Sequence, residues 1–147
     1  MAVVFCDTSV LLAAILEQHV HHARSVAVVR RLNRNTAACA LHSLAEVYAT
    51  LGQIPTGGPR PAPSDVRAAV ADILRVFMPI ALTTRDYNVV LDRLAASGIY
   101  GGRVYDALIL QCAAKANASA VYTWNTKHFR ALASPELLPL IREPELL

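Results

Sequence analysis

Residues 2–16 read AVVFCDTSVLLAAIL, and the order of apolar and polar residues in this stretch decides the fold. Its first part, residues 2–6, is short and wholly apolar, which predicts a buried β-strand. The polar residues 7–9 follow where that strand ends, and the apolar residues 10–16 predict a helix. A buried strand that leads directly into a helix is typical of a parallel sheet covered by helices.

The same alternation of short apolar runs and helical segments continues along the chain. Further strands are predicted at residues 36–41, 79–82 and 120–123, with a last edge strand at 138–141. Helices are predicted at residues 21–34, 42–51, 64–77, 84–96, 104–116 and 127–132. Residues 52–63 are rich in Gly and Pro, which predicts a loop and a mobile segment. We therefore expect an α/β class protein, a three-layer α/β/α sandwich with a central, mostly parallel sheet of four to five strands, in one domain over residues 1–147.

Composition narrows the class of protein. Of the 147 residues 54% are hydrophobic and the mean hydropathy is +0.36, which argues against an intrinsically disordered chain. The 14 Lys and Arg exceed the 11 Asp and Glu, and this mildly basic balance is compatible with a nucleic-acid partner. No apolar run reaches the roughly 18 residues of a membrane helix, and the first residues lack the basic region of a signal peptide. The three cysteines are far apart in apolar surroundings, so we expect reduced thiols, a cytoplasmic protein and no membrane association.

Polar residues follow three of the predicted strands, where ligands bind in open α/β sheets. Asp7 follows the first strand, and Glu46 comes shortly after the second. Asn125 follows the strand at 120–123, and Asp106 opens the helix that leads into that strand. The topology therefore predicts that these side chains gather at one edge of the sheet.

Each of these acids also has a purely structural interpretation. Asp7 can cap the first helix, and Ser43 with Glu46 matches the S-x-x-E capping box. Asp106, in a first helical turn, complements the helix dipole. Three carboxylates at one edge would nevertheless repel one another, by about 4 kcal/mol per pair at ~4 Å and an effective dielectric constant near 20. Such a cluster needs protons or a cation, and oxygen ligands alone favour Mg²⁺ or Mn²⁺.

Four short motifs carry a resemblance to a known family: Cys6-Asp7-Thr8-Ser9, Ser43–Val47, Tyr105–Ile109 and Tyr122–Phe129. In this order, and on the predicted strand ends, they resemble PIN-domain ribonucleases, and the short chain is similar to the VapC toxins of bacterial toxin–antitoxin pairs. The Gly-rich residues 98–103 resemble the same group. The resemblance spans roughly residues 2–141 and implies a PIN-like sandwich.

The resemblance implies a role for each matched residue. Asp7 and Asp106 match the principal metal-binding aspartates, and Glu46 matches a second acid that supports the ion or its waters. Ser9 matches a hydroxyl that orients the first aspartate. Asn125 stands where many members have a fourth acid; it can support the site as a ligand but brings no charge. We therefore hypothesise one tightly bound Mg²⁺, with any second ion arriving only with the substrate phosphate.

The implied reaction is metal-dependent hydrolysis of RNA phosphodiesters, with Asp7, Glu46 and Asp106 as catalytic residues. Arg103 and Lys127 are candidate phosphate contacts, although ordinary solvated charge explains them equally well.

The remaining expectations concern a third candidate RNA contact, His128, and the protein partners of the chain. His128 is a candidate contact to the RNA, with a surface histidine as its alternative. The resemblance also implies a VapB-type antitoxin partner and a toxin homodimer.

The sequence alone leaves two other functions open. The same acids occur in phosphatases and DNA-directed nucleases, but an aspartyl-nucleophile hydrolase wants a second acid two residues after the first, where this chain has Ser9. A degenerate PIN domain that binds RNA or protein without cleavage is the alternative from another class. Asn125 is its only support.

Overall fold

A five-stranded parallel sheet forms the centre of the molecule, and the computed structural model describes it within residues 2–53 and 59–145. The strand order is β3-β2-β1-β4-β5, and each neighbouring pair is parallel. The strands are β1 (Val4–Cys6), β2 (Ala37–Ala40), β3 (Met78–Ile80), β4 (Ala120–Tyr122) and β5 (Ile141–Arg142). The predicted parallel sheet is confirmed, and its carboxyl ends share one edge.

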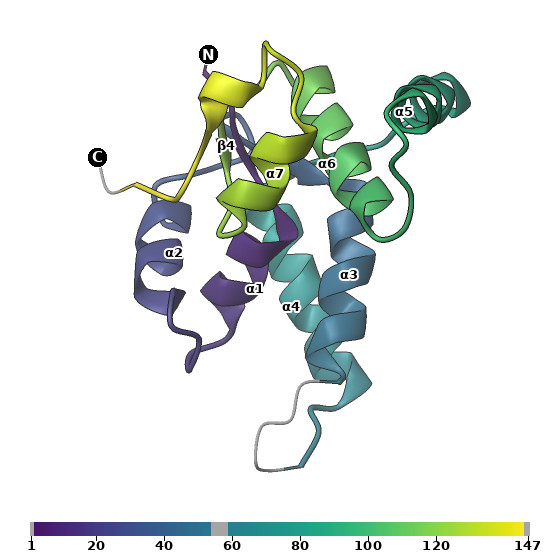
Figure 1. Cartoon of the computed structure of the whole chain (residues 1–147). Helices are drawn as coiled ribbons and strands as arrows, with labels where there is room; N and C mark the ends of the chain where they lie inside the picture. Colours follow the sequence, from purple (N-terminus) through teal and green to yellow (C-terminus); the bar gives the residue numbers. More distant parts are fainter. Residues whose placement is uncertain (1, 54–58, 146–147) are drawn as a thin grey trace.

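Helices cover both faces of the sheet, which confirms the predicted α/β/α sandwich (Figure 1). Residues of the first four helices pack in one core cluster and residues of the sixth and seventh helices in a second, while the fifth helix packs against the sixth. The helices are α1 (Thr8–Ile15), α2 (His22–Val29), α3 (Leu41–Leu51), α4 (Pro63–Val76), α5 (Thr84–Ala96), α6 (Arg103–Lys115) and α7 (Thr126–Leu132), with a 3-10 turn at Leu138–Leu140. Among the described helices, none has both the length and the apolar character needed to cross a membrane.

The two-residue period of the strands divides the core between the two faces. In β1, Cys6 packs with Val10 of α1, whereas Phe5 packs on the opposite face with Ile109 of α6 and Phe129 of α7. The cysteines are buried and free, as predicted for reduced thiols. This burial fixes the strand ends, and with them the residues that immediately follow β1, β2 and β4.

Several predicted details differ from the structure. Helix α2 ends at Val29 rather than near residue 34, and Arg34 instead donates to the backbone carbonyl of Leu74. Helix α4 begins at Pro63, one residue before the predicted start at residue 64, and proline at the first position already has the required φ. Of the predicted loop at 52–63, residues 54–58 lie outside the described residues.

A capping box at the start of α5 gives a prediction for pH-dependent stability. Thr83 Oγ1 accepts from the Asp86 backbone N–H at 3.2 Å, Asp86 Oδ2 accepts from the Thr83 N–H at 2.8 Å, and Lys115 Nζ donates to the same Oδ2 at 3.0 Å. The Thr83 N–H and the Lys115 ammonium lower the pKa of Asp86 to about 2.

Because the folded pKa of Asp86 lies below the unfolded one, the stabilisation is present near neutral pH and is lost as pH falls through about 4 to about 2. We expect Asp86→Asn to lower the melting temperature at about pH 7 and to match the unsubstituted chain at about pH 2. Thermal unfolding monitored by circular dichroism at both pH values checks this; an equal gap at both would contradict it.

Candidate active site

Three carboxylates meet at the carboxyl edge of the sheet, from three separate elements. Asp7 directly follows β1, Glu46 lies on α3, which continues from β2 without a loop, and Asp106 lies in the first turn of α6. The charges of Asp7 and Glu46 both raise the pKa of Asp106, which places the three side chains within electrostatic reach of one another. The predicted gathering of acids at one edge is thus present in the fold.

Asp7 is held in a network of hydroxyl groups and is only 3% exposed. Ser9 Oγ and Thr123 Oγ1 both donate to Asp7 Oδ2, each at 2.8 Å. Each hydroxyl in turn accepts a backbone N–H at 3.0 Å, from Trp124 and Asn125 respectively, so its own proton is directed at the carboxylate. Burial raises the pKa of Asp7, and the two hydroxyls oppose that rise. The side chain makes no capping hydrogen bond to α1, so the capping interpretation does not account for Asp7.

Glu46 has a hydroxyl partner of its own in Thr8, the residue after Asp7. Thr8 Oγ1 lies 3.2 Å from Glu46 Oε1 and 2.8 Å from Ser43 Oγ, and His42 Nε2 lies 3.6 Å from Glu46 Oε1. Burial raises the pKa of Glu46, while His42 and Thr8 lower it. The capping-box interpretation of Ser43 and Glu46 is wrong, because α3 begins at Leu41 with no side-chain cap and Ser43 is fully buried against Thr8.

Asp106 sits where a helix dipole alone would favour its charged form. Its pKa is nevertheless raised, first by burial and then by the charges of Asp7 and Glu46, while His128 lowers it. Burial is the main cause of this rise, and the neighbouring carboxylates add to it. A divalent cation would relieve this repulsion for all three acids.

The donor set fits a hydrated hard cation rather than an enclosed metal centre. Within the described residues, no three His, Cys, Asp or Glu side chains converge closely enough to hold a metal between them. Mg²⁺ retains several of its waters and is usually bound through one or two carboxylates, so an open arrangement of oxygen donors suits it. Asp7, Glu46 and Asp106 offer only oxygen donors to such an ion.

The remaining predicted residues surround this edge. Asn125 occupies the position before α7, and its side chain makes no capping hydrogen bond. Arg103 is the first residue of α6, and Lys127 and His128 lie in the first turn of α7. All four are exposed, and His128 is close enough for its charge to act on Asp106.

Three residues that contact the acids were not assigned a role from the sequence. Thr123 follows β4 as Asp7 follows β1, and that shared position after a strand is the signal that could have identified it. His42 precedes Glu46 by four residues, the spacing of neighbours on a helix face. Thr8 follows Asp7 in the first motif, and its contact with Glu46 depends on the packing of α1 against α3.

The Thr123 hydroxyl gives a second prediction. Thr123→Val keeps the shape of the side chain but removes its hydrogen bond to Asp7, and we expect RNA cleavage to fall by about 10- to 100-fold. The cost in stability should be about 1–3 kcal/mol, because the Asn125 N–H loses its buried acceptor. Cleavage rates beside urea unfolding measure both effects. Thr123→Ser retains the hydroxyl and should recover most of the rate; failure of that recovery would show that only packing matters here.

Comparison with known protein families gives a match over most of the chain. A family model described as the PIN domain matches residues 4–134. Ribonuclease VapC40 of Mycobacterium tuberculosis is 36% identical over 132 residues, which cover 90% of this chain and 91% of that protein. Ribonuclease VapC27 of the same species is 36% identical over 112 residues, 76% of this chain and 77% of that protein.

Solved structures share the fold at lower sequence identity. A VapBC2 structure from Rickettsia felis, bound to a DNA fragment from its promoter, aligns with a TM-score of 0.65 and 18% identity, over 97% of this chain and 99% of that chain. Mycobacterium tuberculosis VapC20, described as a sarcin-ricin loop cleaving toxin, aligns with a TM-score of 0.69 and 17% identity, over 87% of this chain and 94% of that one.

Proposed function

This chain belongs to the PIN-domain family, and from that membership we propose that it is a divalent-metal-dependent endoribonuclease, the toxin of a type II toxin–antitoxin pair. The observation that carries the proposal is the placement of Asp7, Glu46 and Asp106 near the carboxyl ends of the strands, where the charges of Asp7 and Glu46 raise the pKa of Asp106. The match to ribonuclease VapC40 covers 90% of the chain, and we propose that its 147 residues form one PIN domain.

The acids and their hydroxyl partners divide the work of the site. Asp7 and Asp106 hold a divalent ion, and Glu46 and Asn125 support it. An ion held there supplies Lewis-acid assistance to phosphodiester hydrolysis. Ser9 and Thr123 fix the orientation of Asp7 by donating to one of its oxygens, so the carboxylate is positioned before the ion binds.

We propose Mg²⁺ as the ion, with Mn²⁺ as a substitute, because all the donors are hard oxygen atoms. Asn125 contributes no charge, so the edge carries three formal negative charges and binds one ion tightly without RNA. A second ion then requires the charge of the substrate phosphate. A calorimetric titration of the RNA-free protein with Mg²⁺ should give one tight site.

The substrate is RNA, and its phosphates have cationic partners on either side of the acids. Arg103 begins α6 three residues before Asp106, and Lys127 and His128 lie in the first turn of α7, two and three residues after Asn125. Their exposure leaves them available to phosphate oxygens.

The protein partners are a VapB-type antitoxin and a second copy of the chain. The Rickettsia felis relative in fold was solved as a VapBC2 assembly. Helix α5 exposes Val89 and Leu91, 49% and 44% accessible, and such apolar side chains favour coverage by a partner.

The test is cleavage of total cellular RNA by the purified, antitoxin-free chain with Mg²⁺ and with EDTA. Discrete fragments that form only with Mg²⁺ are expected. If folded protein binds RNA without cutting it, the non-cleaving PIN domain replaces this proposal. Cleavage of DNA or of a phosphomonoester in place of RNA would instead identify the nuclease or phosphatase alternative.

A further inference from the structure

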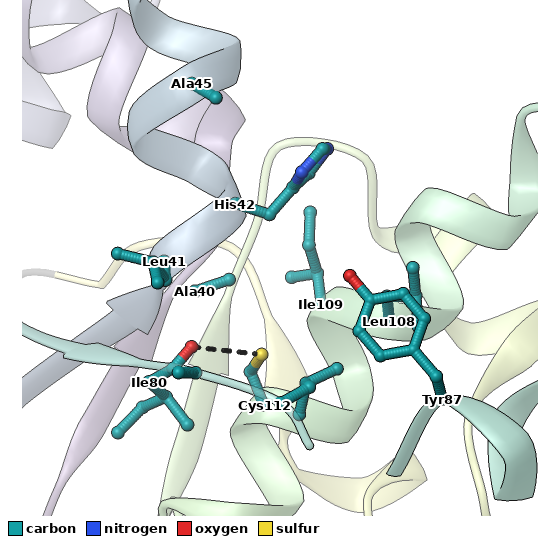
Figure 2. A pocket seen from close by; sticks show the side chains of 11 residues that line it. Ala40, Leu41, His42, Ala45, Ile80, Tyr87, Leu108, Ile109 and Cys112 are labelled. Carbon is teal, nitrogen blue, oxygen red and sulfur yellow. Dashed lines mark hydrogen bonds between the residues drawn. The ribbon is translucent and has the colours of Figure 1, made fainter. Parts of the chain in front are cut away.

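An apolar pocket opens beside the acidic edge and contains none of the three carboxylates. Its volume is about 320 Å³, and it is lined by the ends of β2 and β3, the residues after β3, and helices α3, α5 and α6. Figure 2 shows Leu41, Ile80 and Ile109 around this space, with the His42 ring and the Tyr87 hydroxyl reaching it from different elements. The walls are therefore largely aliphatic, and polar groups stand at two places on the lining.

The pocket and the acidic edge share His42. Its Nε2 lies 3.6 Å from Glu46 Oε1, while its ring lines the pocket. The ring also stacks on Tyr105, with centroids 5.5 Å apart and planes 4° from parallel, and Tyr105 immediately precedes Asp106. Tyr105 is 53% exposed, and its ring and that of His42 form one aromatic surface. This surface joins the pocket to the residues that accompany Glu46 and Asp106.

The wall formed by residues 80–82 is fixed by contacts from α6. Cys112 Sγ donates to the Ile80 carbonyl at 3.5 Å, as Figure 2 shows, and Lys115 Nζ donates to the Ala81 carbonyl at 2.9 Å. Lys115 is itself paired with Asp86 of α5 at 3.0 Å. The pocket is thus preformed, as ligand pockets usually are.

We propose that this pocket receives an unpaired nucleobase of the RNA substrate, next to the phosphodiester held at the acids. The inference rests on the proposed ribonuclease function. A nucleobase has two apolar faces and a polar edge, which matches aliphatic walls with an imidazole and a phenol at their border. Because base and phosphate belong to the same nucleotide chain, a site that shares His42 with Glu46 is placed to receive a base near the bound phosphate. The pocket then selects which bond is cut.

Ala45 offers a way to fill the pocket without disturbing the acids. It lies on the exposed surface of α3 and lines the pocket, so Ala45→Phe places a ring in that space. Ala49, one turn further along α3, is also exposed but does not line the pocket, and Ala49→Phe is the matched control. Thermal unfolding verifies that both variants are folded.

The experiment maps cut sites in total RNA by sequencing fragment ends and measures kcat and KM on a short RNA containing the preferred site. We expect Ala45→Phe to lower kcat/KM at least about tenfold, mainly through KM, and Tyr87→Phe to change the preferred base at one position beside the cut. Ala49→Phe should retain wild-type rates and preference. If Ala45→Phe, Tyr87→Phe and Ala49→Phe all kept the cleavage rates and base preference of the unsubstituted protein, the inference would be overturned while the ribonuclease function stands.

A second readout does not depend on cleavage. In EDTA, each of AMP, GMP, CMP and UMP is added to protein with labelled isoleucine methyl groups, and the Ile80 and Ile109 resonances should shift for at least one nucleotide. Ala45→Phe should abolish those shifts. Absence of any shift in the unsubstituted protein would overturn the inference. A changed oligomeric mass of Ala45→Phe with an unchanged base preference would also overturn it, because that result identifies a protein–protein interface. No cleavage by the unsubstituted protein under any condition would instead contradict the ribonuclease proposal itself.

Discussion

Asp7→Asn is expected to reduce RNA cleavage by roughly 10³-fold and, without divalent ions, to make the protein more stable. The loss of activity follows from the loss of a charged ligand, since a metal ion contributes several kcal/mol to the transition state and each ~1.4 kcal/mol is tenfold in rate. The amide of Asn keeps the size of the side chain and still accepts from Ser9 and Thr123. The substitution therefore removes charge with little change in packing.

The gain in stability follows from the raised pKa of Asp7, which burial causes. A folded pKa above the unfolded value means that the folded state binds more protons, so stability falls as pH rises from about 4 through the folded pKa. The Asn variant has no such dependence at this position. Its advantage in EDTA should therefore be small in acid and larger near neutral pH, and Mg²⁺ should stabilise only the unsubstituted chain.

Urea unfolding in EDTA and in Mg²⁺, at about pH 4 and about pH 7, measures these differences. Asp92→Asn, at an exposed position on α5, is the control for loss of one negative charge and should keep full activity. If Asp7 were simply a helix cap, Asp7→Asn would leave cleavage intact, since Asn caps as well as Asp does. That outcome would remove Asp7 from the metal site.

The sequence pattern predicted the sheet and the edge at which the acids meet because both depend on local features. Apolar runs identify β1, β2 and β4, and parallel strands necessarily bring Asp7 and the residues after Ala40 to the same edge. The capping box predicted at Ser43 failed because β2 passes directly into α3, which leaves Ser43 inside the helix. Its position there depends on where the strand ends, which no local motif encodes.

The contacts that fix the acids depend on packing between distant segments. Thr123 reaches Asp7 across 116 residues of sequence, and Thr8 reaches Glu46 across 38. Hydroxyl residues are common in loops and caps, so neither position stands out before the chain is folded. The pocket lined by Tyr87 and Ile109 likewise exists only because α5 and α6 flank the end of β3.

Asp106→Asn is the second substitution with a large expected effect, because two interpretations of this residue predict opposite changes in stability. If Asp106 served only the dipole of α6, its neutralisation would cost about 0.3–1 kcal/mol and leave cleavage unchanged. If it belongs to the carboxylate cluster, its charge is unfavourable without metal. The raised pKa, caused by burial and by Asp7 and Glu46, supports the cluster.

We therefore expect Asp106→Asn to lose cleavage by roughly 10³-fold, as Asp7→Asn does, and to equal or exceed the unsubstituted protein in stability when EDTA is present. Asp65→Asn is the matched control: Asp65 lies in the first turn of α4 and is exposed, so its neutralisation should show the ordinary dipole cost with full activity. Parallel urea unfolding and RNA cleavage assays of the two variants compare one helix position in two electrostatic settings. If Asp106→Asn lost as much stability as Asp65→Asn and retained cleavage, Asp106 would act only as a charge at the helix terminus. The opposite pair of results would place Asp106 in the carboxylate cluster, whose repulsion is relieved by protons or by a bound cation.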